Sequence, residues 1–122
     1  MDKKILVIED DNVLQKAVSI ALKEAGFRVH QAFNGEEGVE KAKLFKPDLI
    51  LLDLLMPVMD GREALKIIKK DNELKDIPVI IFTVYEQEQA IAECNSMGAK
   101  GYFLKSSYSL EDIVNKVNEI LE

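Results

Sequence analysis

The sequence predicts an α/β fold in which a parallel sheet is covered on both faces by helices. Short, continuous apolar runs such as KILVI (4–8) and VIIFT (79–83) are typical of strands that are buried on both faces. Each run is followed by a segment with apolar residues at helical spacing, and the connections are only a few residues long. Strands and helices therefore alternate, which favours right-handed crossovers and one domain over residues 1–122.

The first half of the chain is predicted to hold three strands and two helices. The expected strands are 4–8, 27–33 and 48–53. The first helix begins near Val13 and is closed by Gly26, because apolar residues recur between them at a spacing of 3.6. Asn34 and Glu37 resemble a capping box that opens a second helix to about Phe45, before Pro47.

The second half is predicted to add three helices and two strands. Pro57 and the pair Asp60, Gly61 stop the third strand, turn the chain and start a helix to about Lys70. The remaining elements are expected at 79–83 (strand), 86–98 (helix with a thin apolar face), 101–104 (strand) and 110–121 (helix opened by a Ser109–Asp112 capping box). The most hydrophobic strands are the first, third and fourth, which should be central. A doubly wound, flavodoxin-like (βα)5 sheet of strand order 2-1-3-4-5 fits that pattern.

Composition excludes several classes of protein. The net charge is −6, with no basic cluster interleaved with aromatic residues, so direct nucleic-acid binding is not expected of this domain. No apolar run approaches the roughly 20 residues of a spanning helix, and no secretory signal follows MDKK, so we expect a cytoplasmic protein without membrane association. With one cysteine, Cys94, and one histidine, His30, a multi-Cys or multi-His metal site is excluded.

The chemistry-bearing residues all follow predicted strands. Asp53 is an ionisable residue inside an apolar run, and Glu9, Asp10, Thr83 and Lys105 also stand at strand ends. Because the carboxyl ends of parallel strands share one edge of the sheet, three carboxylates should meet there and require a cation. Oxygen ligands without His or Cys favour Mg²⁺, with Mn²⁺ possible. Together with an ammonium and a hydroxyl, this set suits phosphoryl transfer onto an aspartate.

Four motifs give the chain a close resemblance to the receiver domains of two-component response regulators. They are the Glu9–Asp10 pair after ILVI, DLLMPVMDG around Asp53, Thr83 after VIIF, and GYFLK ending at Lys105. The resemblance extends over essentially the whole chain. It implies a phosphorylation-activated signalling switch and not an enzyme.

The resemblance also implies roles for individual residues. Asp53 would accept a phosphoryl group from a phosphohistidine on a sensor histidine kinase or phosphotransfer protein. Asp10, Asp53 and the backbone carbonyl of Leu55 would bind Mg²⁺ directly, with Glu9 acting through water, and Lys105 would hold phosphoryl oxygens.

A conformational switch is part of the same expectation. Thr83 would move to the phosphoryl group, and Tyr102 would swing inward, because phosphorylation adds charge and acceptor oxygens. That shift would remodel the face formed by the fourth helix, fifth strand and fifth helix, and so control an output domain or protein. The domain would be a monomer or a phosphorylation-dependent dimer, and it could be a stand-alone receiver or the first domain of a longer regulator.

Two residues depart from the usual pattern of the family. Ser106 replaces the usual proline after the active-site lysine, which leaves the peptide isomer open, and Val84 is bulky where a small residue is usual.

Two alternative functions are less well supported by the sequence. A haloacid-dehalogenase-like phosphatase would need a second Asp at position 55, which is Leu. A receiver-shaped scaffold that never accepts phosphate would usually lack an active-site residue, and none is lost here.

Overall fold

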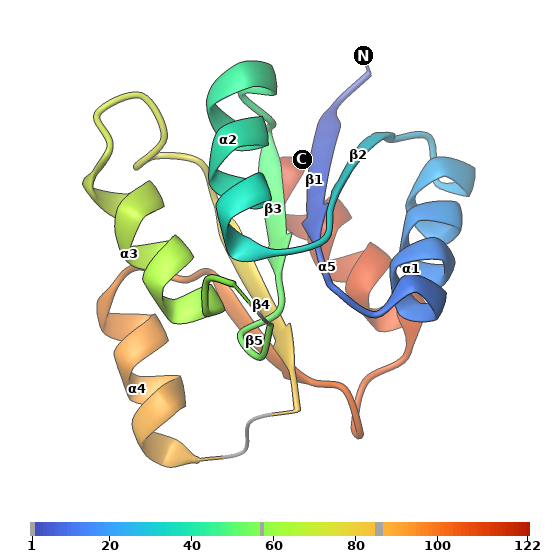
Figure 1. The fold of residues 1–122 in the computed structure, drawn as a ribbon. Coiled ribbons are helices and arrows are strands. Elements are labelled where there is room, and N and C mark those ends of the chain that lie inside the picture. Colours follow the sequence, from blue (N-terminus) through green and yellow to red (C-terminus); the bar gives the residue numbers. More distant parts are fainter. Residues whose placement is uncertain (1, 57, 85–86) are drawn as a thin grey trace.

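The chain forms one five-stranded parallel sheet with helices on both faces (Figure 1). This computed structural model describes residues 2–56, 58–84 and 87–122. Pro57, which is predicted to help stop the third strand and turn the chain, lies outside the described residues. The elements are β1 (Lys4–Ile8), α1 (Asn12–Glu24), β2 (Arg28–Ala32), α2 (Gly35–Phe45), β3 (Leu49–Leu52), α3 (Gly61–Lys70), β4 (Val79–Thr83), α4 (Glu88–Ser96), β5 (Gly101–Leu104) and α5 (Leu110–Leu121).

The strand order is β2-β1-β3-β4-β5, which confirms the predicted flavodoxin-like arrangement. All four neighbouring pairs are parallel, and Ile8 pairs with both Ala32 and Leu52. The residues of β3 and β4 are entirely buried, whereas those of β5 are half-buried. The apolar runs therefore predicted the central strands correctly, because a strand covered on both faces has no solvent side to carry polar residues.

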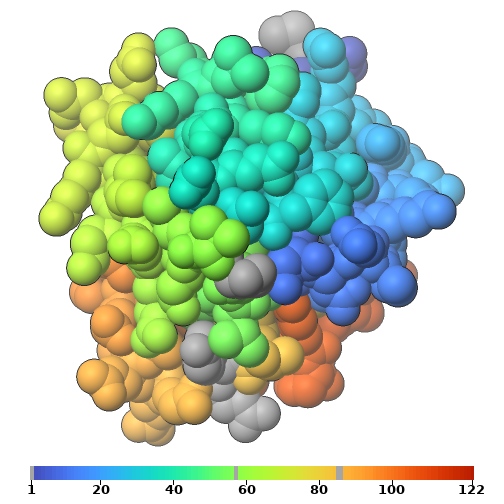
Figure 2. Space-filling view, viewed as in Figure 1, coloured from blue at the N-terminus to red at the C-terminus, as the bar shows by residue number. Residues whose placement is uncertain are grey.

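Two apolar cores lie on opposite faces of the sheet. On one face, α2, α3 and α4 contribute Val39, Leu65 and Cys94 to the core under α2, α3 and α4, between these helices and the sheet. These helices cover the face seen in the space-filling view (Figure 2). On the other face, α1 and α5 contribute Leu22 and Val117. Each strand of the interior thus supplies alternate side chains to two separate cores.

Several predicted boundaries shift by one or two residues. The second strand covers Arg28–Ala32 and not 27–33, the third covers Leu49–Leu52 and not 48–53, and the fourth helix is described from Glu88 to Ser96 and not over 86–98. Asp53 therefore lies just after β3, and residue 86 lies outside the described part. Ends of elements depend on local hydrogen bonds that apolar patterns do not encode.

The caps explain where the helices begin. The Asp11 carboxylate accepts hydrogen bonds from Val13 and Leu14 N–H, and the Ser109–Asp112 capping box is present as predicted. The second predicted box is only half formed. Asn34 accepts from the Glu37 N–H at 2.8 Å. The Glu37 carboxylate, however, accepts from the N–H of Phe33, one residue before the cap.

Candidate functional site: an acidic cavity with a bridging lysine

Asp53 stands at the first position after β3, where the strand enters the β3–α3 loop. Its backbone N–H donates to the Ile8 carbonyl at 3.0 Å, which extends the β1–β3 ladder by one bond, and its side chain is almost fully buried. The loop then folds back, and Gly61 N–H donates to the Leu54 carbonyl at 2.9 Å. A Cβ at position 61 would lie 2.2 Å from the Asp53 carbonyl oxygen, so only glycine permits this close approach.

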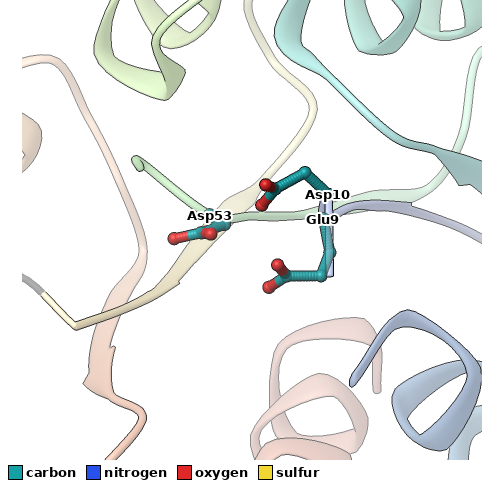
Figure 3. Close-up of side chains that lie close together, drawn as sticks. All are labelled: Glu9, Asp10 and Asp53. Atoms are coloured by element: carbon teal, nitrogen blue, oxygen red, sulfur yellow. The ribbon is translucent and has the colours of Figure 1, made fainter. Parts of the chain in front are cut away.

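Glu9 and Asp10 follow β1 and face Asp53. Glu9 N–H donates to the Ala32 carbonyl at 3.0 Å, and its side chain is buried, whereas that of Asp10 is exposed. One carboxylate oxygen from each of Glu9, Asp10 and Asp53 lies within 4.8 Å of the others (Figure 3). The sequence prediction that these three acids meet at one edge of the sheet is confirmed.

Lys105 bridges two of the three acids. Its Nζ lies 2.8 Å from Glu9 Oε1 and 3.1 Å from Asp53 Oδ2, and it also lies 5.9 Å from the centre of the Phe82 ring. The backbone places this residue, because Lys105 N–H donates to the Thr83 carbonyl at 2.9 Å at the end of the β4–β5 ladder. The ammonium thus partly compensates the acids, and the cluster keeps an excess of negative charge.

Burial and neighbouring charges shift the pKa values of Glu9 and Lys105. Burial raises the pKa of Glu9 to about 7, with the Asp53 charge adding to this effect and the hydrogen bond from Lys105 opposing it. For Lys105, burial lowers the pKa, but the hydrogen bond to Glu9 and the charge of Asp53 outweigh burial and raise the pKa above its ordinary value. Lys105 is therefore charged at neutral pH, and Glu9 is poised between its two forms.

The three carboxylates line an open cavity of about 480 Å³ at the carboxyl edge, the edge of the sheet where the strands have their carboxyl ends. Its other lining residues are Asp11, Leu55, Met56, Val84 and Lys105. Clustered carboxylate oxygens are the ligands that hard divalent cations prefer, and an excess of negative charge beside open space suits such an ion. The residues present therefore fit a divalent metal.

The remaining predicted site residues differ in burial and in their position relative to this cavity. Thr83 is fully buried at the end of β4, and Tyr102 is half-buried on β5, where it packs against the core under α2, α3 and α4. Leu55 is 50% exposed and donates its N–H to Asp53 Oδ1 at 3.3 Å, and Val84 is 54% exposed. No described peptide bond is cis, including that between Lys105 and Ser106. Leu55 and Val84 line the cavity, whereas Thr83 and Tyr102 are not among the described residues that line it, and the roles of all four in metal binding and switching stay predictions.

Two features of the site were missed from the sequence. The Lys105–Glu9 ion pair was not expected, because sequence spacing does not show which of several acids a long side chain reaches. Gln15 was also missed, although it is buried and hydrogen-bonds the Glu9 carbonyl. A signal for Gln15 existed, since it shares a helix face with buried Val18 and Leu22, where a polar residue needs partners.

The comparisons with known proteins agree with this geometry. Residues 5–118 match the family described as response regulator receiver domain. Protein PilH of Pseudomonas aeruginosa is 33% identical over 118 residues, which are 97% of this chain and 97% of PilH. The DNA-binding dual master transcriptional regulator RpaA of Synechocystis is 36% identical over 118 residues, which are 97% of this chain but 48% of RpaA. The chain thus spans about half the length of several transcriptional regulators that it matches.

Solved structures show the same fold at similar identity. The chemotaxis protein CheY4 of Vibrio cholerae aligns with a TM-score of 0.90 at 28% identity, covering 98% of this chain and 99% of that one. A CheY-like receiver domain protein of Methanospirillum hungatei aligns with a TM-score of 0.92 at 26% identity, covering 99% and 94%. No helix in the described part of the chain has the length and apolar character needed to cross a bilayer.

Proposed function

Because the chain belongs to the response regulator receiver domain family, we propose that it is a signalling switch in which Asp53 accepts a phosphoryl group from a partner histidine kinase or phosphotransfer protein. The 122 residues act as one receiver domain, and the output resides in another domain or protein. Any DNA binding by a longer regulator would belong to that other part.

The observation that carries the proposal is the position of the Asp53 carboxylate. It is held at the floor of an open cavity by the Leu55 N–H on Oδ1 and by Lys105 Nζ on Oδ2. The carboxylate is therefore oriented, yet reachable by a donor from the solvent side. A buried acid that serves only structure would be enclosed by its partners.

The chain's own residues can support an in-line transfer. An Asp53 oxygen forms the new O–P bond while the N–P bond of the donor phosphohistidine breaks, and the electron pair returns to the imidazole nitrogen. Lys105 is charged, and its ammonium would pair with the phosphoryl oxygens and so compensate the added negative charge. Glu9, Asp10, Asp53 and the Leu55 carbonyl would hold Mg²⁺ or Mn²⁺, which when bound neutralises charge on the carboxylates and on the phosphoryl group.

Phosphorylation would then bias the conformation of the neighbouring elements. An aspartyl phosphate adds about one unit of negative charge and new acceptor oxygens beside Thr83 and Lys105. Movement of the Thr83 side chain would open space for Tyr102, which lies on the adjacent strand and pairs with Ile81. The face formed by α4, β5 and α5 is the surface that this change would alter, and the output partner or a second receiver would read it.

Intact mass spectrometry after incubation with acetyl phosphate and Mg²⁺ tests the proposal. We expect a gain of one phosphoryl group in the native protein, no gain in Asp53→Asn, and no gain after chelation of the metal. Glu63→Gln, which changes an exposed acid on α3, serves as the matched control and should be labelled like the native protein. Absence of labelling in the native protein would refute the phosphoacceptor function and favour an interaction module.

A further inference from the structure

A buried hydrogen-bonded network lies behind the acidic cavity, between α1 and the carboxyl ends of β1 and β2. Gln15 on α1 is 1% exposed, and its Nε2 lies 3.0 Å from the carbonyl oxygens of both Val7 and Ala32. The Glu9 carbonyl oxygen lies 3.3 Å from the same nitrogen. On its other side, Gln15 Oε1 accepts a hydrogen bond from Ser19 Oγ at 3.0 Å.

The contacts determine which way the Gln15 amide points. Three carbonyl oxygens surround one end, so that end must carry the hydrogens, because an oxygen there would face three other acceptors. Ser19 Oγ in turn accepts from Gln31 Nε2 at 2.9 Å, which leaves its own hydrogen for Gln15 Oε1. Among the described residues, every buried side-chain nitrogen and oxygen has a hydrogen-bond partner. The network is therefore complete and has a single arrangement of donors and acceptors.

The network holds the backbone from which two of the acids project. Gln15 Nε2 and the Glu9 N–H share the Ala32 carbonyl as acceptor, so the helix is tied to the last β1–β2 bond. The Glu9 carbonyl belongs to the same planar peptide unit as the Asp10 N–H, so its direction sets how Asp10 leaves the strand.

Asp10 depends on this backbone more than the other two acids do. The carboxylates of Glu9 and Asp53 are buried and are held directly by Lys105, whereas the side chain of Asp10 is exposed. Its distance to the other carboxylates is therefore governed by the peptide that Gln15 holds.

We propose that Gln15 is a positioning residue of the acidic cavity, whose side-chain amide orients the Glu9–Asp10 peptide and so raises the affinity of the cavity for a divalent cation. The inference rests on the metal-binding part of the proposed function. Residues that orient metal ligands without touching the metal commonly change metal affinity by about 10- to 100-fold when they are replaced.

Titration with MgCl₂ followed by ¹H–¹⁵N NMR tests the inference, with circular dichroism melting curves for each variant. Gln15→Met keeps the length of the side chain and removes its hydrogen bonds. We expect the Kd for Mg²⁺ to rise about tenfold in this variant. Val18→Ala, which removes a buried group on the same helix without touching the network, lowers the melting temperature and should leave the Kd unchanged.

A purely structural Gln15 would give a different pattern, with a lower melting temperature in Gln15→Met and the Kd of the native protein. That result would overturn the inference and leave the proposed function intact. If the native protein itself shows no saturable Mg²⁺ shifts near Asp10 and Asp53, the metal-binding part of the proposed function fails, and the inference fails with it.

If Gln15→Met does not fold, Ser19→Ala tests the same network one bond further from the cavity. It removes the donor to Gln15 Oε1 and should raise the Kd severalfold relative to Val18→Ala. Equal affinities in these two variants would overturn the inference.

Discussion

The two ends of the carboxyl edge are built differently, although both contribute to the same cavity. At the β1–β3 end, the strands are buried and α1 is capped by the Asp11 carboxylate. At the β4–β5 end, the β5 residues are half-buried, and α4 buries only Ala90 and Cys94. The N-cap of α4, Gln87, makes no side-chain cap hydrogen bond.

This difference separates a fixed part from an adaptable part. The acids Glu9 and Asp53 belong to the end with many buried partners, so their geometry is maintained before any ligand arrives. Thr83 ends β4, which leads toward α4, and Lys105 follows β5, which α4 contacts. Because α4 buries few side chains, a shift at this end costs less free energy. The comparison predicts that substitutions at the two ends have unequal effects.

The largest effect is expected from Gly61→Ala at the fixed end. The new Cβ would lie 2.2 Å from the Asp53 carbonyl oxygen and 2.6 Å from Leu54 Cα, and both are backbone atoms. We expect a loss of about 3 kcal/mol or more in the free energy of unfolding, measured by urea denaturation. Gly101→Ala is the matched control on β5, where the nearest atoms lie at 3.5 Å or beyond, and its effect should stay within about 0.5 kcal/mol. Equal losses would contradict the comparison.

Thiol reactivity of Cys94 measures how readily the α4 end opens. Burial raises the pKa of this thiol to about 11 from 9.0, so at pH 8 the thiolate fraction falls about 100-fold. In the closed native state Cys94 should therefore be almost unreactive toward iodoacetamide, because its side chain is fully buried and its thiolate is rare. We also expect the reaction to proceed through local opening, so its rate should be insensitive to low urea. A rate that follows global unfolding would mean that α4 is held as firmly as α1.

Metal-free protein should lose stability as the pH rises through neutrality. The folded pKa of Glu9 is raised from 4.5 to about 7, so its contribution to stability is fully present below about pH 4.5 and is lost as the pH rises through 7. We expect the melting temperature in EDTA to fall between pH 5 and pH 8, and Glu9→Gln to reduce this fall. An equal pH dependence in both proteins would rule out Glu9 as its source.

The smallest effect is expected from capping the adaptable helix. Gln87→Asp supplies the carboxylate that α4 lacks at its N-cap and should stabilise that helix by about 1 kcal/mol. Hydrogen exchange of the α4 amides should slow accordingly. Ser109→Ala at the N-cap of α5 is the converse change, and it should cost about as much, because it removes a capping box that is present. No slowing of α4 exchange in Gln87→Asp would show that the missing cap does not limit this helix.

Much of the candidate site followed from its placement at strand ends. Glu9, Asp10, Asp53, Thr83 and Lys105 all come directly after or at the end of apolar runs, and a parallel sheet must bring such positions to one edge. The predicted α1, α3 and α5 also agree closely with the structure, because their apolar faces and caps are local patterns. The left-handed backbone of Val58 could not be predicted in this way. Its φ is 71°, a conformation that β-branched residues rarely adopt.

Short-range patterns of polarity were sufficient to predict the alternation of strands and helices, the burial of the central strands and the residues at the carboxyl ends of the strands. Packing between distant segments, in contrast, sets which acids Lys105 bridges, why position 61 admits only glycine, and how Gln15 holds the Glu9 carbonyl. Those features join residues that are distant in the chain, and their distances depend on how the layers pack together rather than on any local pattern.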